Sequence, residues 1–300
     1  MKKITFLLIV AIILAFGVNS CQDKDGVYNP KHKISKVYAK MDTYSDDELI
    51  FSAPKQLAQT WNWKKNKLES IAMQNGTYTF HYDGKQVSKI TAGVSSMNFS
   101  YDGKNLTKIV ITVPLATQTV TILERDNSRN ITKMRYEITT AGFFAKSFEE
   151  FKTTFSPTKD LMTLGLSNQI ADILEKNIEK KYELYQNAKG TVIIDFTLTY
   201  SGGNATQVTI VEDGESETYH YTYDNKPSPY YQFTQGYAQF VHSPLGFSKN
   251  NILSYYAASA PNTIYRNTYT YDGDKIASWH YIVNYDYSVH AEWTQYYEYE

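Results

Sequence analysis

Cysteine is nearly absent from this chain of 300 residues, in which Cys21 is the only one. A single cysteine cannot form an internal disulfide, so the fold must be held together by its core alone. Thiol catalysis and cysteine-based zinc sites are excluded as well, because no cysteine remains beyond position 21.

The short motifs that usually mark an enzyme are also missing. The sequence has no His-Glu-x-x-His, Gly-x-Ser-x-Gly or Gly-x-x-x-x-Gly-Lys run. His81 lies near Asp83 and His220 near Asp224, but alternation places the histidines on a solvent-facing strand surface and the aspartates in turns. We therefore expect a non-catalytic protein without a metal ion or another cofactor.

Charge of one sign does not accumulate along the chain. Lysine and arginine together number 30 against 31 for aspartate and glutamate, and the isoelectric point is about 6.6. A nucleic-acid-binding protein would show a basic patch and a high isoelectric point. The scattered charges exclude a nucleic-acid partner and are typical of an ordinary solvated surface.

The N-terminus carries a charged and then apolar leader. Lys2 and Lys3 precede the uncharged residues 4–17, after which short side chains follow. This order is that of a secretory signal, and the run is shorter than the roughly 20 apolar residues that cross a bilayer. We predict that residues 1–20 are a signal peptide that is removed from the mature protein.

Residues 18–21, Val-Asn-Ser-Cys, resemble the lipobox of bacterial lipoproteins, whose cysteine is acylated and becomes the first mature residue. The resemblance implies lipidation of Cys21 and a membrane partner held through that anchor. Residues 22–25 resemble the acidic signal that directs Bacteroidota lipoproteins to the outer face of the outer membrane. We expect an outer-membrane lipoprotein in which residues 21–32 form a solvated tether, and either face of that membrane fits the sequence.

A repeated unit fills much of the mature chain, which is rich in tyrosine with 27 Tyr, 14 Phe and 4 Trp. Residues 82–90 align with residues 101–109 as Tyr-Asp-Gly-Lys followed by apolar-x-Lys-apolar. Asp-Gly between alternating runs is a strong hairpin signal, because glycine accepts a positive φ and aspartate bonds the local backbone. Degenerate copies begin near Ile34, Leu68, Ile131, Ala205, Tyr223, Ile252 and Tyr271.

Apolar and polar residues alternate on either side of these turns, so each strand has one buried face and one solvent-exposed face. Such strands fit an antiparallel meander better than a parallel sheet and argue against a lipid-facing barrel, whose outer band must be apolar. Leu106 and Ile109 are three residues apart, which predicts a bulge. The fold class is therefore all-β: a single curled or barrel-like antiparallel meander of repeated β-hairpins with a short α-helical insert.

Two segments interrupt the β pattern within one predicted domain, residues 33–300. Apolar residues fall near helical spacing over residues 147–188, which predicts the helical insert. Residues 227–251 are long for a hairpin loop, and such loops are often functional or packed as a lid.

The repeats at Tyr82, Tyr101 and Tyr271 resemble shortened Tyr-Asp repeats of Rhs and teneurin-type shells. Residues 223–227 and 248–251, with Tyr271-Asp272-Gly273, are similar to the C-terminal signature of Bacteroidota lipoproteins described as having a porin-like fold. The resemblance implies a curled or closed antiparallel sheet and a location in the cell envelope. It carries over no catalytic residue.

Aromatic rings are densest near the C-terminus and in the long loop. Packing of cross-strand rings in the core is the simplest interpretation, and a glycan-stacking surface is the functional one. The rings that could bind a ligand are Trp279, Tyr281, Trp293, Tyr297, Tyr230 and Tyr231.

These observations favour a non-catalytic, lipid-anchored envelope protein that binds an extracellular ligand such as a glycan. An envelope scaffold that binds another protein is the main alternative, and it predicts an exposed apolar patch or an unpaired strand edge. A hydrolase acting on polysaccharide or peptide is less favoured, because it requires two facing carboxylates or a positioned histidine beside a pocket.

Overall fold

The computed structural model describes residues 25–73, 76–113, 116–140, 191–212, 214–233, 244–284 and 289–300. The predicted signal peptide, Cys21 and the predicted helical insert lie outside these ranges. Within them, no helix has the length and apolar character needed to cross a membrane.

Sixteen antiparallel strands make up the described part of the chain, with one 3-10 turn, η1 (Leu245–Phe247). The strands are β1 (Ile34–Ser45), β2 (Glu48–Lys64), β3 (Lys67–Met73), β4 (Gly76–Asp83), β5 (Gln86–Ala92), β6 (Ser95–Asp102), β7 (Asn105–Val113), β8 (Ala116–Arg125), β9 (Ile131–Thr140), β10 (Thr191–Ser201), β11 (Asn204–Glu212), β12 (Glu215–Pro227), β13 (Asn250–Ala257), β14 (Tyr265–Asp272), β15 (Lys275–Asn284) and β16 (Val289–Tyr299).

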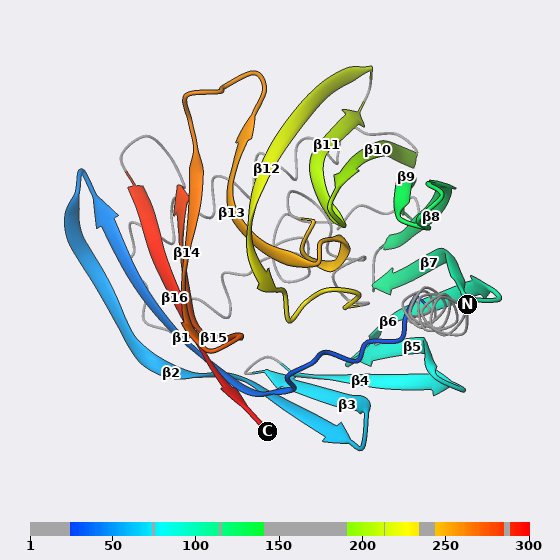
Figure 1. Ribbon diagram of the computed structural model, residues 1–300, viewed down its shortest axis with the longest axis horizontal. Coiled ribbons are helices and arrows are strands. Elements are labelled where there is room, and N and C mark those ends of the chain that lie inside the picture. Colours follow the sequence, from blue (N-terminus) through cyan, green and yellow to red (C-terminus); the bar gives the residue numbers. More distant parts are fainter. Residues whose placement is uncertain are drawn as a thin grey trace, which may run out of the picture.

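The sheet closes on itself into an up-and-down barrel. Every strand pairs with its neighbours in sequence, and β1 pairs with β16 from Ile34 opposite Tyr299 to Ser45 opposite Val289. Figure 1 shows the strands as a ring seen from one end. The predicted all-β antiparallel meander is confirmed, and of the two forms that the sequence allows, curled or barrel-like, the structure has the closed one.

Each repeat unit is one β-turn-β step with a bulge after the turn. Gly84 and Gly103 adopt φ values of +58° and +57°, a left-handed conformation that favours glycine. The ladder from β6 to β7 shifts register beside Tyr101, and Leu106 and Ile109 are both fully buried. The bulge predicted from the three-residue spacing is therefore present, and it turns both apolar side chains inward.

The tyrosine of a unit connects it to the unit before it. The Tyr82 hydroxyl donates to the Leu68 carbonyl at 2.8 Å, and the Tyr101 hydroxyl donates to the Val87 carbonyl at the same distance. Tyr223 and Tyr299 make the corresponding bonds to Ala205 and Ile276, at 2.6 and 3.1 Å. These bonds explain why the repeat uses tyrosine rather than phenylalanine, since the ring packs inside while its hydroxyl satisfies a buried carbonyl.

Inward and outward side chains differ sharply in character. In β6, Phe99 is buried whereas its neighbours Asn98 and Ser100 are exposed. On the outer wall, hydroxyl groups of neighbouring strands form hydrogen bonds. Thr222 Oγ1 of β12 and Ser254 Oγ of β13, for example, lie 2.7 Å apart. The outward positions of these strands are polar, as the alternation in the sequence predicts.

Two chain segments fill one mouth of the barrel. Tyr28, in the segment before β1, packs against Trp61 of β2 and against Phe233, with ring centroids 6.3 and 5.0 Å apart. Tyr230, in the connection from β12 to β13, packs against Trp279 on the far wall at 6.4 Å. This connection lies in the middle of the ring in Figure 1. We call residues 25–33, 228–233 and 244–249 the plug; the last two are the described parts of the predicted long loop.

The N-terminal part of the plug differs from the solvated tether that the sequence suggests. Tyr28 is only 4% exposed, and its hydroxyl donates to the Pro229 carbonyl. Gly26 has a φ of +73°, and a Cβ atom there would lie 2.1 Å from the Tyr101 hydroxyl. The packed part of the described chain therefore includes residues 25–33, because an aromatic anchor and a close backbone approach hold this segment inside the mouth.

The seam between β13 and β14 has the fewest paired residues in the barrel, and side-chain hydrogen bonds reinforce it. Two residue pairs join β13 to β14, whereas seven join β15 to β16. Asp224 accepts hydrogen bonds from the Asn251 amide nitrogen at 3.1 Å and from the Tyr271 hydroxyl. Asn251 Nδ2 also contacts Tyr271 at 3.2 Å. The three stretches that carry the porin-like sequence resemblance thus meet in one hydrogen-bond network at this seam.

Candidate functional site

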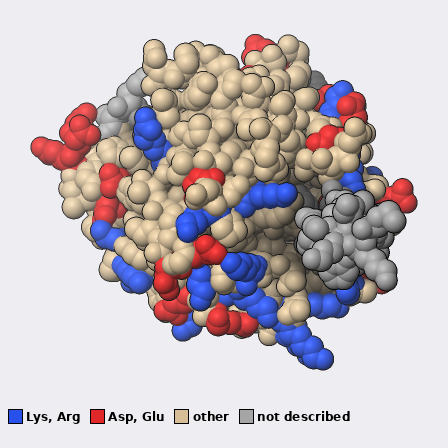
Figure 2. Space-filling view, viewed as in Figure 1, with Lys and Arg blue, Asp and Glu red and all other residues tan. Residues whose placement is uncertain are grey.

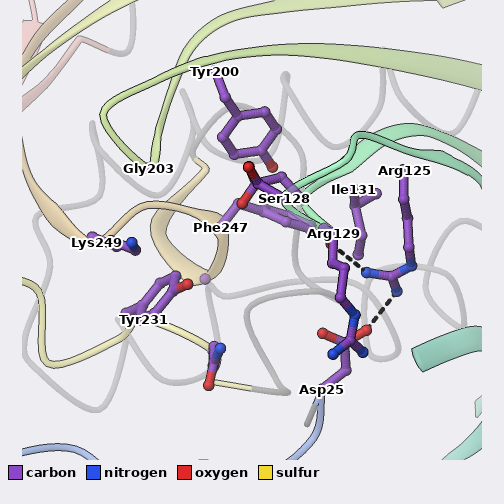
Figure 3. Close-up of a pocket in the computed structure, with 13 residues that line it drawn as sticks. Asp25, Arg125, Ser128, Arg129, Ile131, Tyr200, Gly203, Tyr231, Phe247 and Lys249 are labelled. Carbon is purple, nitrogen blue, oxygen red and sulfur yellow. Dashed lines mark hydrogen bonds and ion pairs between the residues drawn. The ribbon is translucent and has the colours of Figure 1, made fainter. Parts of the chain in front are cut away.

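A cleft of about 330 Å³ opens at the plugged mouth (Figure 3). The turn from β8 to β9 forms one side, the turn from β10 to β11 another, and the plug a third. The lining residues are Asp25, Arg125, Ser128, Arg129, Asn130, Ile131, Tyr200, Gly203, Tyr231, Gln232, Gly246, Phe247 and Lys249. Each side comes from a different part of the sequence, and together they form a concave site of the size usual for small ligands.

Arg125 organises the floor of the cleft. Its Nη2 forms an ion pair with the Asp25 carboxylate and donates to the Leu106 carbonyl at 2.8 Å. Its Nη1 donates to the Arg129 carbonyl at 2.8 Å. Asp25 also accepts from the Leu106 amide at 2.8 Å. Because the two side chains are only 16% and 14% exposed, Arg125 neutralises Asp25 and ties the N-terminal segment to two hairpin turns.

The turn from β8 to β9 presents Arg129 to the cleft. The Asp126 carboxylate caps this turn by accepting from the Asn130 amide at 2.8 Å, and Arg129 has a φ of +67°. Arg129 Nε donates to the Asn105 side-chain oxygen at 3.2 Å, and Nη2 reaches the same oxygen. A neutral amide therefore orients the guanidinium without cancelling its charge.

Lys249 enters from the opposite side and lies over Gly203. A Cβ atom on Gly203 would come within 2.6 Å of Lys249 Cδ, and the Lys249 amide donates to the Gly203 carbonyl at 3.3 Å. Gly203 also has a φ of +83°. The Gly-Gly turn thus makes room for the lysine stem, which carries its ammonium group to the cleft.

Three rings, Tyr200, Tyr231 and Phe247, complete the lining (Figure 3). Burial raises the pKa of Tyr200, with nearby phenols and Asp126 adding to the effect, so its hydroxyl stays protonated and can donate a hydrogen bond. The cleft can therefore offer ring faces, neutral hydroxyl groups and cationic donors to a ligand. No group of three or more potential metal ligands occurs in the part of the chain that the structure describes.

The structure separates the six rings that the sequence singles out. Tyr230 and Tyr297 meet inside the barrel with their hydroxyl oxygens 2.9 Å apart, and Tyr297 is 8% exposed. Trp279, Tyr281 and Trp293 form a half-buried series on the inner wall of β15 and β16, with ring centroids 4.8 and 6.5 Å apart. Only the sixth ring, Tyr231, reaches the cleft. Ligand binding by these rings remains a prediction.

No pattern in the sequence indicates the charged residues of the cleft. Arg129 and Lys249 stand 120 positions apart in separate turns, and no local pattern connects them. Asp25 falls within the predicted tether. The cleft is formed only when the barrel closes and the plug enters its mouth.

The histidine–aspartate pairs of the sequence, His81 with Asp83 and His220 with Asp224, do not form a site in the described structure. His81 contacts Thr91 at 3.2 Å on the outer wall, and His220 stacks on Tyr256 with centroids 5.0 Å apart. Asp224 belongs to the β13–β14 seam instead. These contacts fit the predicted placement of the histidines on the solvent-facing side.

A second hollow of about 480 Å³ lies against the inner wall toward the other end of strands β4 to β7. Tyr78, Met97 and Val113 give it a mainly apolar lining, with hydroxyl groups from Ser95 and Ser96. It brings no charged side chain together with its rings, so the cleft at the plugged mouth offers the richer recognition chemistry.

Comparison with known proteins gives matches among solved structures but none among sequences. No family model and no curated protein sequence matches the chain. A porin-like protein from Bacteroides uniformis ATCC 8492 matches at a TM-score of 0.36 with 14% identity, covering 89% of this chain and 98% of that one. A porin-like protein from Bacteroides vulgatus ATCC 8482 matches at 0.32 with 10% identity, covering 90% and 99%. The assignment of the barrel rests on the strand pairing of this chain alone.

Proposed function

We propose that this protein is a non-catalytic, lipid-anchored cell-envelope protein that binds an extracellular ligand such as a glycan at its plugged mouth. The observation that carries the proposal is the cleft, where ring faces stand beside side chains that donate hydrogen bonds. A sugar presents a flat, weakly apolar face and several hydroxyl groups, and both parts find partners in such a lining.

The proposed anchor at Cys21 would lie near the end of the barrel that carries the cleft. Asp25, which is fixed in the mouth by Arg125, follows Cys21 by four residues. An extended chain of that length spans at most about 14 Å. An acylated Cys21 would therefore hold the plugged mouth close to the membrane, with the outer membrane of the envelope as the proposed location.

A non-catalytic role agrees with the lining of the cleft. Asp25 is the one carboxylate among the described lining residues, and Arg125 already neutralises it. A glycosidase uses two carboxylates that face each other across the bond to be cleaved, and the described lining of this cleft offers no second one. The enzyme alternative thus receives no support from this site.

A partner-binding scaffold remains the second candidate because of one specific feature. Leu49 is 56% exposed and Leu57 is 43% exposed, both on β2. Exposed apolar side chains of this size suit a protein contact. The other feature that a scaffold predicts, an unpaired strand edge, does not occur among the described strands, since β1 pairs with β16.

The anchor is tested by Cys21→Ser. We expect the wild-type protein to sediment with the membrane fraction and to carry the mass of acyl chains, whereas the variant is released, because a stable anchor requires the buried methylene groups. Fractionation followed by mass spectrometry of the intact protein measures both properties. Wild-type protein without acyl mass would remove the anchor from the proposal.

Glycan binding is tested by affinity electrophoresis of the full mature chain through gels that contain neutral polysaccharides from plant and host sources. We expect retardation by at least one polymer and an affinity about fivefold weaker in Tyr231→Ala, since loss of one ring contact corresponds to about 1 kcal/mol. Trp293→Ala tests the inner wall in the same gels. Tyr38→Ala, on the outer wall, is the matched control.

Thermal melting must first show that each variant is folded. Retardation that is equal in Tyr231→Ala and Tyr38→Ala would exclude the cleft as the site. If no polymer, neutral or acidic, retards the wild-type protein, the glycan proposal fails and the partner-binding scaffold becomes the better candidate.

A further inference from the structure

Among the described residues, the cleft carries an excess of positive charge. Asp25 neutralises Arg125, and Asp126 adds a second carboxylate in the turn that carries Arg129. Neither Arg129 nor Lys249 forms an ion pair with a described carboxylate, so three cations stand against two carboxylates here. Cations without partners in a partly enclosed site attract anions more strongly than cations on an open surface, because the cleft walls displace water. This local excess contrasts with the net charge of −1 for the whole chain and with the mixed charges on the face shown in Figure 2.

The two cations approach the cleft from different elements. Arg129 stands on the turn from β8 to β9 and Lys249 on the plug, as Figure 3 shows. Asn105 holds Nε and Nη2 of Arg129, so the guanidinium is oriented before a ligand arrives. The fit of Lys249 over Gly203 restricts the lysine stem in a similar way. Preorganised donors lose less conformational entropy on binding than free surface side chains do.

We infer that the cleft recognises an acidic saccharide chain, in which carboxylate or sulfate groups pair with Arg129 on one side of the cleft and with Lys249 on the other, while a sugar ring packs against Tyr231. This inference rests on the proposed glycan-binding function and narrows its ligand class. A carboxylate or sulfate group can pair with a guanidinium donor, and another can pair with an ammonium donor. Burial keeps the Tyr200 hydroxyl group protonated, so it adds a neutral hydrogen-bond donor to the lining.

The experiment compares pairs of polymers that differ in charge but share a backbone. Polygalacturonate is set against its methyl ester, and dextran sulfate against dextran, in affinity electrophoresis of the full mature chain. We expect an acidic polymer to retard the protein more strongly than its uncharged counterpart, with a preference that weakens as salt is added, because screening acts on the ionic contact.

Charge-removing variants locate the contact. Arg129→Gln and Lys249→Met are each expected to weaken binding of the acidic polymer about tenfold, which is the effect of losing one hydrogen bond to a charged group. Lys249→Arg should retain binding. Lys108→Met removes the same charge from the exposed outer face of β7 and should leave binding unchanged. Thermal melting confirms that the variants are folded.

Each other outcome counts against the inference. Equal retardation by charged and uncharged polymers, sensitive to Tyr231→Ala, would overturn acid recognition and leave glycan binding standing. Loss of acidic binding in Lys108→Met to the same extent as in Lys249→Met would show a nonspecific charge effect. Binding to vesicles of phosphatidylglycerol with the same dependence on Arg129 and Lys249 would assign the site to lipid phosphate rather than to a saccharide. Failure of every polymer would remove the glycan-binding proposal as well.

Discussion

Replacing Leu106 by alanine is expected to lower the free energy of unfolding by about 3 kcal/mol, a typical cost for removing a fully buried leucine side chain. Leu106 is 0% exposed and is the first inward residue after its turn. Its amide donates to Asp25 and its carbonyl accepts from Arg125, so a cavity at this position also loosens the attachment of the plug.

Urea unfolding followed by tryptophan fluorescence measures this loss. Leu123→Ala makes the same chemical change at a position that is 43% exposed and should cost less than about 1 kcal/mol, because little apolar area is lost from the core. Similar losses in the two variants would contradict the inward placement of the first apolar residue of the repeat.

Alkaline solution is expected to unfold the barrel between about pH 10 and pH 12. Burial raises the pKa of Tyr82 to about 12 and that of Tyr299 to about 12, while an exposed tyrosine in the unfolded chain titrates near 10. Below pH 10 both states are protonated and the full stability is present. As the pH rises further, the unfolded state loses its phenolic protons first, so stability falls until the folded tyrosines also titrate.

Many rings contribute to this effect, because burial also raises the pKa of Tyr101, Tyr223 and Tyr269. Each pKa unit corresponds to about 1.4 kcal/mol of differential stabilisation, so several tyrosines together can exceed the stability of a typical domain. Phenolate absorbance near 295 nm and circular dichroism should change in one transition. Tyrosine ionisation well below the loss of β-structure would show that the rings are accessible to water.

The repeat units could be predicted from the sequence because their determinants are local. Asp-Gly turns, the two-residue alternation and the three-residue spacing of Leu106 and Ile109 act within one hairpin, and the structure has all three. The partner of each tyrosine hydroxyl could not be predicted, since Tyr101 reaches across to Val87 in the preceding unit. That bond depends on how adjacent hairpins are staggered.

The sequence predicts only part of the candidate site. It indicates the long loop as a functional segment and Tyr231 as a ligand-binding ring, and both line the cleft. The cationic pair of Arg129 and Lys249 has no signature in either turn, because each residue is an ordinary solvated side chain in its own segment. Their juxtaposition follows from the entry of the plug.

The sequence by itself determined the antiparallel meander, the buried and solvent-exposed faces of its strands and the bulged hairpins, because these follow from neighbouring residues and backbone sterics. The tertiary structure alone decided that the sheet closes and that its mouth is plugged, since both depend on contacts between distant segments, such as Tyr28 with Pro229 and Lys31 with Asp274. The cleft arises at the same step, because its lining comes from two hairpin turns and the plug, which no local preference brings together.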